Sequence, residues 1–452
     1  MPSVNEVPGT EGQYGDSSRD RSIYTDQRVL DREAESVFFR SWIFLAFESE
    51  IPMPGDYVLR QLGLDQVIVS RSEDGELHGL LNSCMHRGTQ LCKADLGNTA
   101  HFRCSYHGWT YKNDGRLVAV PRMRTLYPLD FDKSKRGLRH AKVESYRGFV
   151  YGTWDHDAVS LSDYLGASRW YIDALLDMFG GDWVPYAAPQ RVISPGNWKL
   201  QTENFVGDGY HVETTHKAAI EAGLFGDVIP GSGIERPEDI ESVGHQINTD
   251  EGHGLRVVHL RDSQGNALPS KGRRYIGFPP ESFESITDRL SPEQLAFHEG
   301  FAGMHGAIFP NAAFLFVSHS EAVGEPGEPL TAYLCWRVHN PVGPRETEVT
   351  YWTLVPRELP EDWKRRSYGY QARTQSAGGI YFEADDFENF DRIDQMCLGP
   401  NAKNLEFDYS LGLGRATPTQ YVGPGNAETI LMSETNQRNF YARWSALMDQ
   451  DR

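Results

Sequence analysis

Cysteine is scarce in this chain. Its 452 residues include 5 cysteines, at positions 84, 92, 104, 335 and 397. An odd and sparse set excludes a disulfide framework of the kind that stabilises small secreted domains. Metal ligation or inert burial is therefore the better interpretation of these thiols.

Basic residues and long apolar runs are also lacking. Lys and Arg number 44 against 63 Asp and Glu, so the formal net charge is −19. This balance excludes binding to nucleic acid through a basic footprint. The chain has no run of about 20 apolar residues that could span a bilayer. Its first residues are polar and contain no apolar signal core. We therefore expect a cytoplasmic protein that does not bind membranes.

The length exceeds what one hydrophobic core usually holds, so we expect at least two domains. Residues 27–44 carry apolar side chains at helical spacing, which predicts an amphipathic helix. Strand-like runs then follow, and Asn113-Asp114-Gly115 predicts a hairpin turn. We predict an all-β domain over residues 41–160. An N-terminal arm and helix, residues 1–40, would precede it and pack with the second domain.

The remaining residues, 161–452, mix helical and strand-like signals and predict an α+β domain with an antiparallel sheet. A helix is predicted near 199–220. Many Gly and Pro residues between 222 and 300 predict long surface loops. The other expected elements are strands at 313–318, 330–339 and 348–355 and helices within 361–394.

Two pairs of metal-ligating residues lie in the predicted all-β domain. Cys84 and His86 form a Cys-x-His pair, and Cys104 and His107 form a Cys-x-x-His pair. This order suits a [2Fe–2S] cluster with two thiolates on one iron and two imidazoles on the other. A tetrahedral zinc site with the same ligands is the main alternative. A third alternative is that the site binds no metal, with buried cysteine thiols and hydrogen-bonded histidines.

The residues around these ligands, CMHRG and CSYHGW, closely resemble the cluster loops of Rieske-type oxygenases. The resemblance implies a Rieske [2Fe–2S] cluster held by those four residues. The nearby Cys92 lies outside the pattern and is interpreted as an inert thiol.

Two histidines and a distant acidic stretch form a second candidate site. His211 and His216 stand five residues apart, a turn of about 140° around a regular α-helix, so they would not share a face. A π-bulge, or a helix that ends at His216, would bring them together. From spacing alone, ordinary surface or core histidines are favoured. A carboxylate from the acidic stretch FEADD, residues 382–386, would complete the 2-His-1-carboxylate triad of non-haem Fe(II) oxygenases. Such a stretch is more often a solvated helix face.

The segment ENFVGDGYH, residues 203–211, followed by a second His, is similar to the iron helix of aromatic-ring-hydroxylating dioxygenase large subunits. These include the naphthalene, biphenyl and polycyclic-hydrocarbon dioxygenases, and the resemblance covers almost the whole chain. It implies that His211 and His216 bind a mononuclear Fe(II). The third ligand then falls on Asp386, with Asp385 as its competitor.

The same resemblance gives Asp208 a bridging role. It implies that Asp208 bonds to His211 and also accepts a hydrogen bond from His107 of a neighbouring subunit. A carboxylate can accept from two imidazole N–H groups and would orient both rings. Phe205 and Phe382 could stack on an aromatic substrate or simply pack in the core. The full set of residues expected around the iron is Asn204, Phe205, Val212, His305 and Phe382.

The resemblance implies a terminal oxygenase that inserts both atoms of O2 into an aromatic ring to give a cis-dihydrodiol. The first substrate class is a polycyclic or biaryl hydrocarbon. An aromatic carboxylate such as phthalate is an alternative, although it would require a pocket Arg or Lys that the sequence does not place. A Rieske monooxygenase or demethylase is another. A non-enzymatic electron carrier would need far fewer residues.

The partners are also implied. The family forms rings of three large subunits, often with a small β subunit as α3β3. The chain has neither a dinucleotide-binding glycine fingerprint nor a plant-type ferredoxin cysteine run. Electrons from NAD(P)H are therefore expected to arrive through a separate reductase and a ferredoxin.

Overall fold

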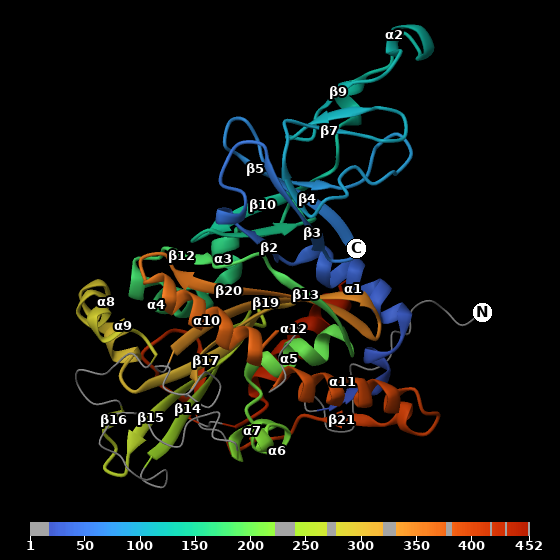
Figure 1. Cartoon of the computed structure of the whole chain (residues 1–452). Coiled ribbons are helices and arrows are strands. Elements are labelled where there is room, and N and C mark those ends of the chain that lie inside the picture. The colour runs from blue at the N-terminus through green and yellow to red at the C-terminus, as the bar shows by residue number, and fades with distance from the viewer. Residues whose placement is uncertain are drawn as a thin grey trace. The chain divides into compact units, whose positions relative to one another are not determined.

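The computed structural model describes residues 18–221, 240–268, 277–319, 331–376, 382–415, 418–429 and 432–450. It forms two compact units (Figure 1). The smaller unit comprises residues 33–164, and the larger comprises residues 1–32 together with 165–452. The division falls inside helix α1 (Gln27–Arg40). None of the helices in the described residues is long and apolar enough to cross a membrane.

The smaller unit is built from antiparallel strands, which confirms the predicted all-β domain. One sheet has seven strands in the order β2-β11-β10-β5-β4-β3-β6, and a second has three in the order β7-β8-β9. The first sheet consists of β2 (Ile43–Phe47), β3 (Asp56–Leu62), β4 (Asp65–Arg71), β5 (Leu77–Leu81), β6 (Leu96–Asn98), β10 (His140–Tyr146) and β11 (Phe149–Thr153). The second consists of β7 (His101–Arg103), β8 (Thr110–Lys112) and β9 (Leu117–Ala119). Two short helices follow β9, α2 (Met123–Leu126) and η3 (Lys133–Arg136).

The predicted hairpin joins β8 to β9. Gly115 has a φ of 85°, in the left-handed region that favours glycine. The Lys112 amide donates to the Arg116 carbonyl at 2.9 Å and closes the turn. The hairpin keeps Tyr111, which is fully buried, in the core beneath the cysteine loops.

The predicted N-terminal helix ends earlier than expected. It stops at Arg40, and Ile43 already begins strand β2. All five residues of β2 are buried, and the strand pairs with β11. A continuous apolar run buried on both faces does not distinguish a strand from a helix by periodicity alone, which explains the error.

The larger unit is an antiparallel sheet of eleven strands with helices packed on it, which confirms the predicted α+β class. The order is β12-β20-β19-β18-β17-β15-β14-β23-β22, while β13 pairs with β20 and β16 with β15. The strands are β12 (Trp183–Pro185), β13 (Gln190–Pro195), β14 (Ile240–Asn248), β15 (Gly254–Asp262), β16 (Ala267–Leu268), β17 (Phe301–Ile308), β18 (Ala312–His319), β19 (Thr331–Gly343), β20 (Glu346–Pro356), β22 (Pro418–Thr419) and β23 (Asn426–Glu428).

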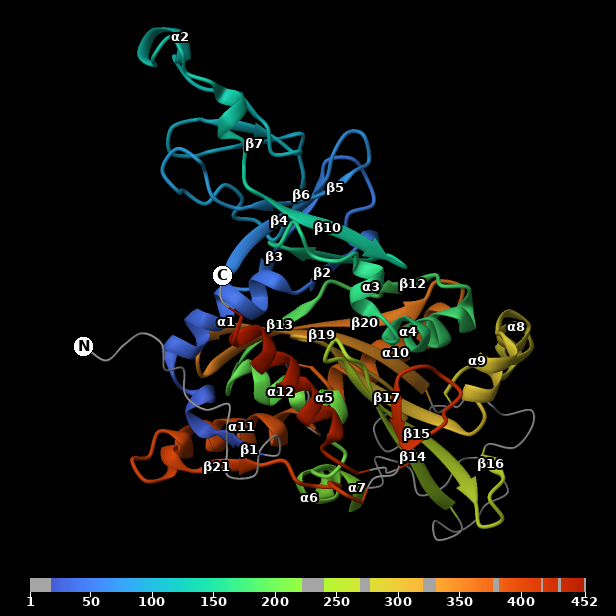
Figure 2. The same ribbon diagram turned by 180° about the vertical axis from the view of Figure 1, so that it is seen from behind.

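Helices cover this sheet and carry the residues of interest. Helix α5 packs against β15, β17 and β18, and α12 packs against α5. Figure 1 and Figure 2 show α5 and α12 side by side. A separate two-stranded sheet joins β1 (Ser18–Asp20) to β21 (Glu406–Asp408). The α-helices of this unit are α4 (Ser168–Leu176), α5 (Trp198–Gly207), α6 (Val212–Thr215), α7 (Lys217–Glu221), α8 (Phe283–Arg289), α9 (Pro292–Phe297), α10 (Glu361–Thr374), α11 (Glu383–Cys397) and α12 (Thr435–Met448). Helix α3 (Leu161–Leu165) lies mostly in the smaller unit. Residue 165 belongs to the larger unit, so α3 reaches across the boundary.

The prediction of long loops over residues 222–300 was wrong for most of the part that the structure describes. Strands β14 and β15 and helices α8 and α9 occupy much of it, while 222–239 and 269–276 lie outside the described residues. The glycines serve turns between regular elements. Gly252, with a φ of 87°, closes the turn from β14 to β15 by donating to the Thr249 carbonyl. Leu255 and Val257 are both buried in the strand that follows.

Candidate metal centres

The two Cys-His pairs occupy loops of the same construction. Cys84 follows β5 and Cys104 follows β7. The Gly88 amide donates to the Cys84 carbonyl at 2.8 Å, and the Gly108 amide donates to the Cys104 carbonyl at 3.0 Å. Both glycines have a positive φ, 72° and 74°, so each turn requires a residue without a Cβ. Each loop thereby presents its Cys and His toward the same point.

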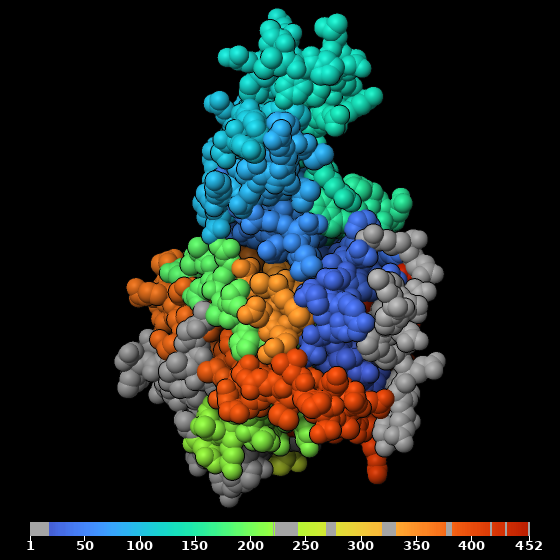
Figure 3. All heavy atoms as spheres, turned by 90° about the vertical axis from the view of Figure 1, so that its right-hand side faces the viewer, coloured from blue at the N-terminus to red at the C-terminus, as the bar shows by residue number. Residues whose placement is uncertain are grey.

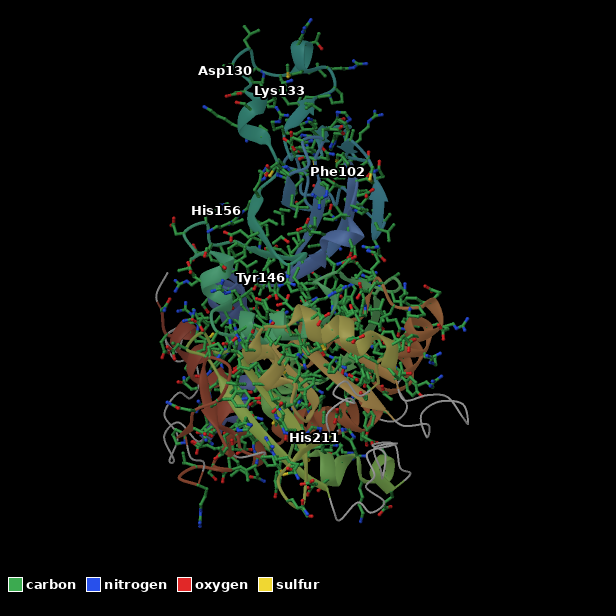
Figure 4. All side chains as sticks on the ribbon, turned by 90° about the vertical axis from the view of Figure 1, so that its left-hand side faces the viewer. Phe102, Asp130, Lys133, Tyr146, His156 and His211 are labelled. Atoms are coloured by element: carbon green, nitrogen blue, oxygen red, sulfur yellow. The ribbon has the colours of Figure 1, made fainter. Side chains whose placement is uncertain are left out.

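The side chains of the two loops meet. Both sulfurs are buried, whereas the two imidazoles are half-buried and their ring centroids lie 4.5 Å apart. Trp109 stacks on His86 with centroids 4.9 Å apart. The Tyr111 hydroxyl lies 3.4 Å from Cys84 Sγ. Figure 4 marks Phe102, whose side chain belongs to the core that contains both cysteines.

These four residues fit a metal cluster by their chemistry. His86 Nδ1 is buried and has no hydrogen-bond partner among the described residues, a deficit that a bond to iron would remove. Burial, with the neighbouring His107, lowers the pKa of His86 and favours the neutral imidazole that binds metals. Burial raises the pKa of Cys104, but hydrogen bonds from the amides of Tyr106 and His107 outweigh it and lower the pKa overall. The thiolate, which is the ligand form, is thus favoured.

The second candidate centre begins at a break in the predicted helix of residues 199–220. Helix α5 ends at Gly207, and α6 is a separate single turn. Asp208 makes the break: its Oδ1 accepts from the amides of Tyr210 at 2.9 Å and His211 at 3.3 Å. Such a side-chain turn competes with helix continuation, and the two glycines beside Asp208 weaken a helix further. The prediction of one continuous helix was wrong.

The break explains how two histidines five residues apart come together. His211 lies just before α6 and His216 just after it, so no π-bulge is needed. Their ring centroids are 5.1 Å apart and the rings are nearly perpendicular. Figure 4 marks His211 in the larger unit.

A carboxylate from α11 lies against both histidines. Asp386 Oδ1 is 3.7 Å from His211 Nε2 and 3.5 Å from His216 Nε2. Within the described part of the chain, these three residues are the group whose ligand atoms all lie within 4.8 Å of one another. Asp385 contacts only His216, at 3.6 Å, and its side chain is 45% exposed. The solvated helix face expected for this acidic stretch therefore describes Asp385 but not Asp386.

The protonation states of this group suit a divalent metal. Burial, together with the nearby His211, lowers the pKa of His216 to about 4, so its imidazole is neutral at pH 7. Burial raises the pKa of Asp386 to about 7. A neutral imidazole at His216 and a carboxylate at Asp386 that is costly to ionise without a counter-charge fit a 2-His-1-carboxylate metal site.

Asp208 orients the first histidine. Its Oδ2 lies 3.1 Å from His211 Nδ1, which leaves His211 Nε2 directed toward Asp386. Burial raises the pKa of Asp208, but the bonds to His211 and to the backbone outweigh it and lower the pKa overall. For His211, burial lowers the pKa, while the Asp208 carboxylate raises it and prevails. The Asp208 side chain keeps 30% exposure, enough to accept from a further partner.

Some of the expected pocket residues contact the two histidines. Asn204 Nδ2 lies 3.4 Å from His211 Nε2, and the Phe382 ring meets His216 edge-on at 5.0 Å. The Phe205 ring is 6.4 Å from the His305 ring, whose Nε2 has no hydrogen-bond partner in the described residues. The fifth, Val212, begins α6 and is half-buried, and its carbonyl accepts from the His216 amide.

Sequence reasoning missed a charged pair beside this group. Arg337 lies on β19 with its guanidinium 4.1 Å from the Phe205 ring centroid, and it pairs with Glu383, the first residue of α11. The available signal was one Arg inside the apolar run TAYLCWRV, residues 331–338. Arg256 on β15 was also missed. Its guanidinium occupies the space of a Cβ at position 209, so a larger residue there would have to displace the Arg256 side chain.

Two family models cover nearly the whole chain. Residues 41–146 match the Rieske [2Fe-2S] domain, and residues 161–450 match the ring hydroxylating alpha subunit (catalytic domain). The chain belongs to the ring-hydroxylating oxygenase large subunits. A Rieske cluster and a mononuclear iron are therefore its cofactors, and the zinc alternative for the cysteine loops is wrong.

Individual relatives agree with this assignment. The chain is 34% identical to the N,N-dimethyl phenylurea N-demethylase subunit alpha of Sphingobium sp. (strain YBL2), over 95% of this chain and 91% of that protein. It is 33% identical to the large oxygenase component of the naphthalene 1,2-dioxygenase system of Pseudomonas aeruginosa, over 94% and 90%. The crystal structure of naphthalene 1,2-dioxygenase from Rhodococcus sp. bound to indole matches with a TM-score of 0.85 and 39% identity, over 95% and 94% of the two chains. Like these relatives, the chain is an oxidoreductase.

Proposed function

We propose that this chain is the terminal oxygenase subunit that inserts both atoms of O2 into the ring of an aromatic hydrocarbon and releases a cis-dihydrodiol. The observation that carries the proposal is the convergence of His211, His216 and Asp386 beside the aromatic side chain of Phe382. The ring-hydroxylating relatives support the same reaction class.

The geometry of the two centres supports a specific set of ligands. Cys84, His86, Cys104 and His107 hold the Rieske cluster, and His211, His216 and Asp386 hold the iron. When bound, the iron would supply O2 activation and the cluster would supply the electrons for it one at a time. Asn204, beside His211 Nε2, borders the position that the iron would occupy.

Asp208 links the two kinds of centre in this proposal. It accepts from His211 of its own subunit and from His107 of a neighbouring subunit, and so fixes both imidazoles. Its remaining exposure supports the second contact. This arrangement requires a neighbouring large subunit. We propose a ring of three large subunits that assembles with a small β subunit as α3β3. A ferredoxin and a separate reductase complete the system as electron donors.

The substrate class follows from the charge beside the iron site. Arg337 is the cation behind Phe205, and its guanidinium is bonded to Glu383 at 2.8 and 3.3 Å. Because the carboxylate neutralises it, Arg337 offers little attraction to an anionic substrate. The aromatic faces of Phe205 and Phe382 instead suit an apolar ring. A polycyclic or biaryl hydrocarbon is therefore favoured over an aromatic carboxylate such as phthalate.

The demethylase relative makes N-demethylation of an arylurea the second candidate. One experiment separates the two. The purified subunit, with a ferredoxin and a reductase, is given naphthalene, biphenyl, phthalate and an N,N-dimethyl phenylurea in parallel. We expect cis-dihydrodiols from the hydrocarbons and little product from phthalate. Formaldehyde release from the urea without any diol would overturn the proposal in favour of demethylation.

A further inference from the structure

The Arg337–Glu383 pair lies deep in the larger unit. The two side chains are 2% and 5% exposed. Arg337 Nη1 donates to Glu383 Oε1 at 2.8 Å, and Nη2 donates to Glu383 Oε2 at 3.3 Å. Nη2 also donates to Gln375 Oε1 at 2.7 Å, and the Tyr351 hydroxyl donates to Glu383 Oε1 at 3.0 Å. Arg337 Nε has no hydrogen-bond partner among the described residues. The two-pronged contact gives the pair a defined geometry.

The contacts connect four elements at one point. Arg337 belongs to β19, Tyr351 to the adjacent strand β20, and Gln375 follows the last residue of α10. Glu383 is the first residue of α11. The pair therefore fastens the beginning of α11 to the centre of the sheet. Much of the rest of α11 has exposed side chains, and Figure 3 shows its orange-red spheres at the surface.

The fastened residue and the proposed iron ligand share a helix face. Asp386 follows Glu383 by three positions, and residues three apart on a helix are neighbours. In the same turn, the Asp386 amide donates to the Phe382 carbonyl at 3.2 Å. Phe382 in turn contacts the His216 ring. A displacement of Glu383 would thus move both Asp386 and Phe382 relative to the histidines.

We infer that Arg337 and Glu383 are positioning residues for the iron site: they hold the first turn of α11 so that the Asp386 carboxylate meets His211 and His216. The inference rests on the proposed iron ligands. Metal–ligand distances in a sound site lie within about 0.2 Å of their standard values. The position of a carboxylate in the first turn of a helix depends on the position of that turn. An ionic anchor costs desolvation, which an apolar core contact would avoid. A defined ligand position is the property that this anchor adds here.

The test measures Fe(II) affinity and needs no turnover. The full-length holoenzyme is stripped of mononuclear iron with a chelator and titrated with Fe(II), while the cluster absorbance reports the concentration of intact protein. We expect Arg337→Met to weaken Fe(II) binding by about 10- to 100-fold, as changes next to metal ligands commonly do. Arg337→Lys keeps the positive charge but loses the two-pronged contact of the guanidinium, so its Fe(II) affinity should be intermediate.

Arg357 provides a matched control. It forms an ion pair with Asp182 in the same unit, but both side chains are 60% exposed. Arg357→Met should bind Fe(II) as the wild type does. Equal affinity, within twofold, in Arg337→Met and the wild type would overturn the inference. If Arg337→Met does not fold, the same criterion is applied to Arg337→Lys. His211→Ala tests the ligand assignment separately. If the assignment is right, this variant loses its iron; if the assignment is wrong, the iron stays bound.

Discussion

Replacing Asp208 by Asn removes one negative charge and changes little else. The amide oxygen of Asn can still accept from the amides of Tyr210 and His211, so the turn after α5 is kept. The contact between Asp208 Oδ2 and His211 Nδ1, at 3.1 Å, is lost as a charge-assisted hydrogen bond. Hydrogen bonds to charged groups contribute about 1.5–3 kcal/mol. That range corresponds to roughly 10- to 150-fold for the orientation of His211 alone.

The loss of activity should exceed this range, because Asp208 is also the proposed acceptor for His107 of a neighbouring subunit. We expect Asp208→Asn to keep the cluster spectrum and, in excess Fe(II), the mononuclear iron, while NADH-driven product formation falls by more than about 100-fold. Asp262→Asn is the control, since Asp262 caps an exposed turn in the same way and touches no histidine of the site. Product formation at the wild-type rate in Asp208→Asn would refute the bridging role.

Further predictions concern the ligands and a buried acid. His211→Ala should lose the mononuclear iron while the cluster spectrum persists; iron analysis checks this, and loss of the cluster instead would mean that the two sites are wrongly divided. Asp386→Ala should lose iron but Asp385→Ala should not, and the reverse result would make Asp385 the ligand. Glu203, bonded to the hydroxyls of Tyr409 and Tyr441, has a pKa that burial raises to about 8. A carboxyl whose pKa is raised on folding contributes stability below its unfolded pKa, near 4.3, and loses it as the pH rises through 8. Glu203→Gln should therefore unfold at a higher temperature than the wild type at pH 8.5, and this advantage should vanish near pH 4; a pH-independent difference would contradict the cause.

The cluster loops are predictable from sequence because everything that forms them is local. The ligands lie two or three residues apart, and each glycine closes the turn of its own ligand pair. The helix around His211 is predictable only in part. The Asp208 turn that ends α5 leaves a recognisable Gly-Asp-Gly signal at residues 207–209, but the apolar spacing around it still favours one helix.

The rest of the iron site depends on contacts between distant segments. Asp386 differs from Asp385 by its burial against the histidines. The sequence does not show which of two adjacent Asp residues will be buried. The Arg337–Glu383 pair joins a central strand to a helix end, and each partner alone suggests nothing about the other. Strands β14 and β15 were hidden by the glycines of their turn, which resemble those of a loop.

Dioxygenation itself is tested most directly by isotope incorporation. The complete system is incubated with naphthalene under 18O2, and the product is analysed by mass spectrometry. We expect a cis-diol that contains two 18O atoms, since both oxygen atoms come from one O2. A product with a single 18O atom, or a diol whose second oxygen derives from water, would contradict the proposed reaction.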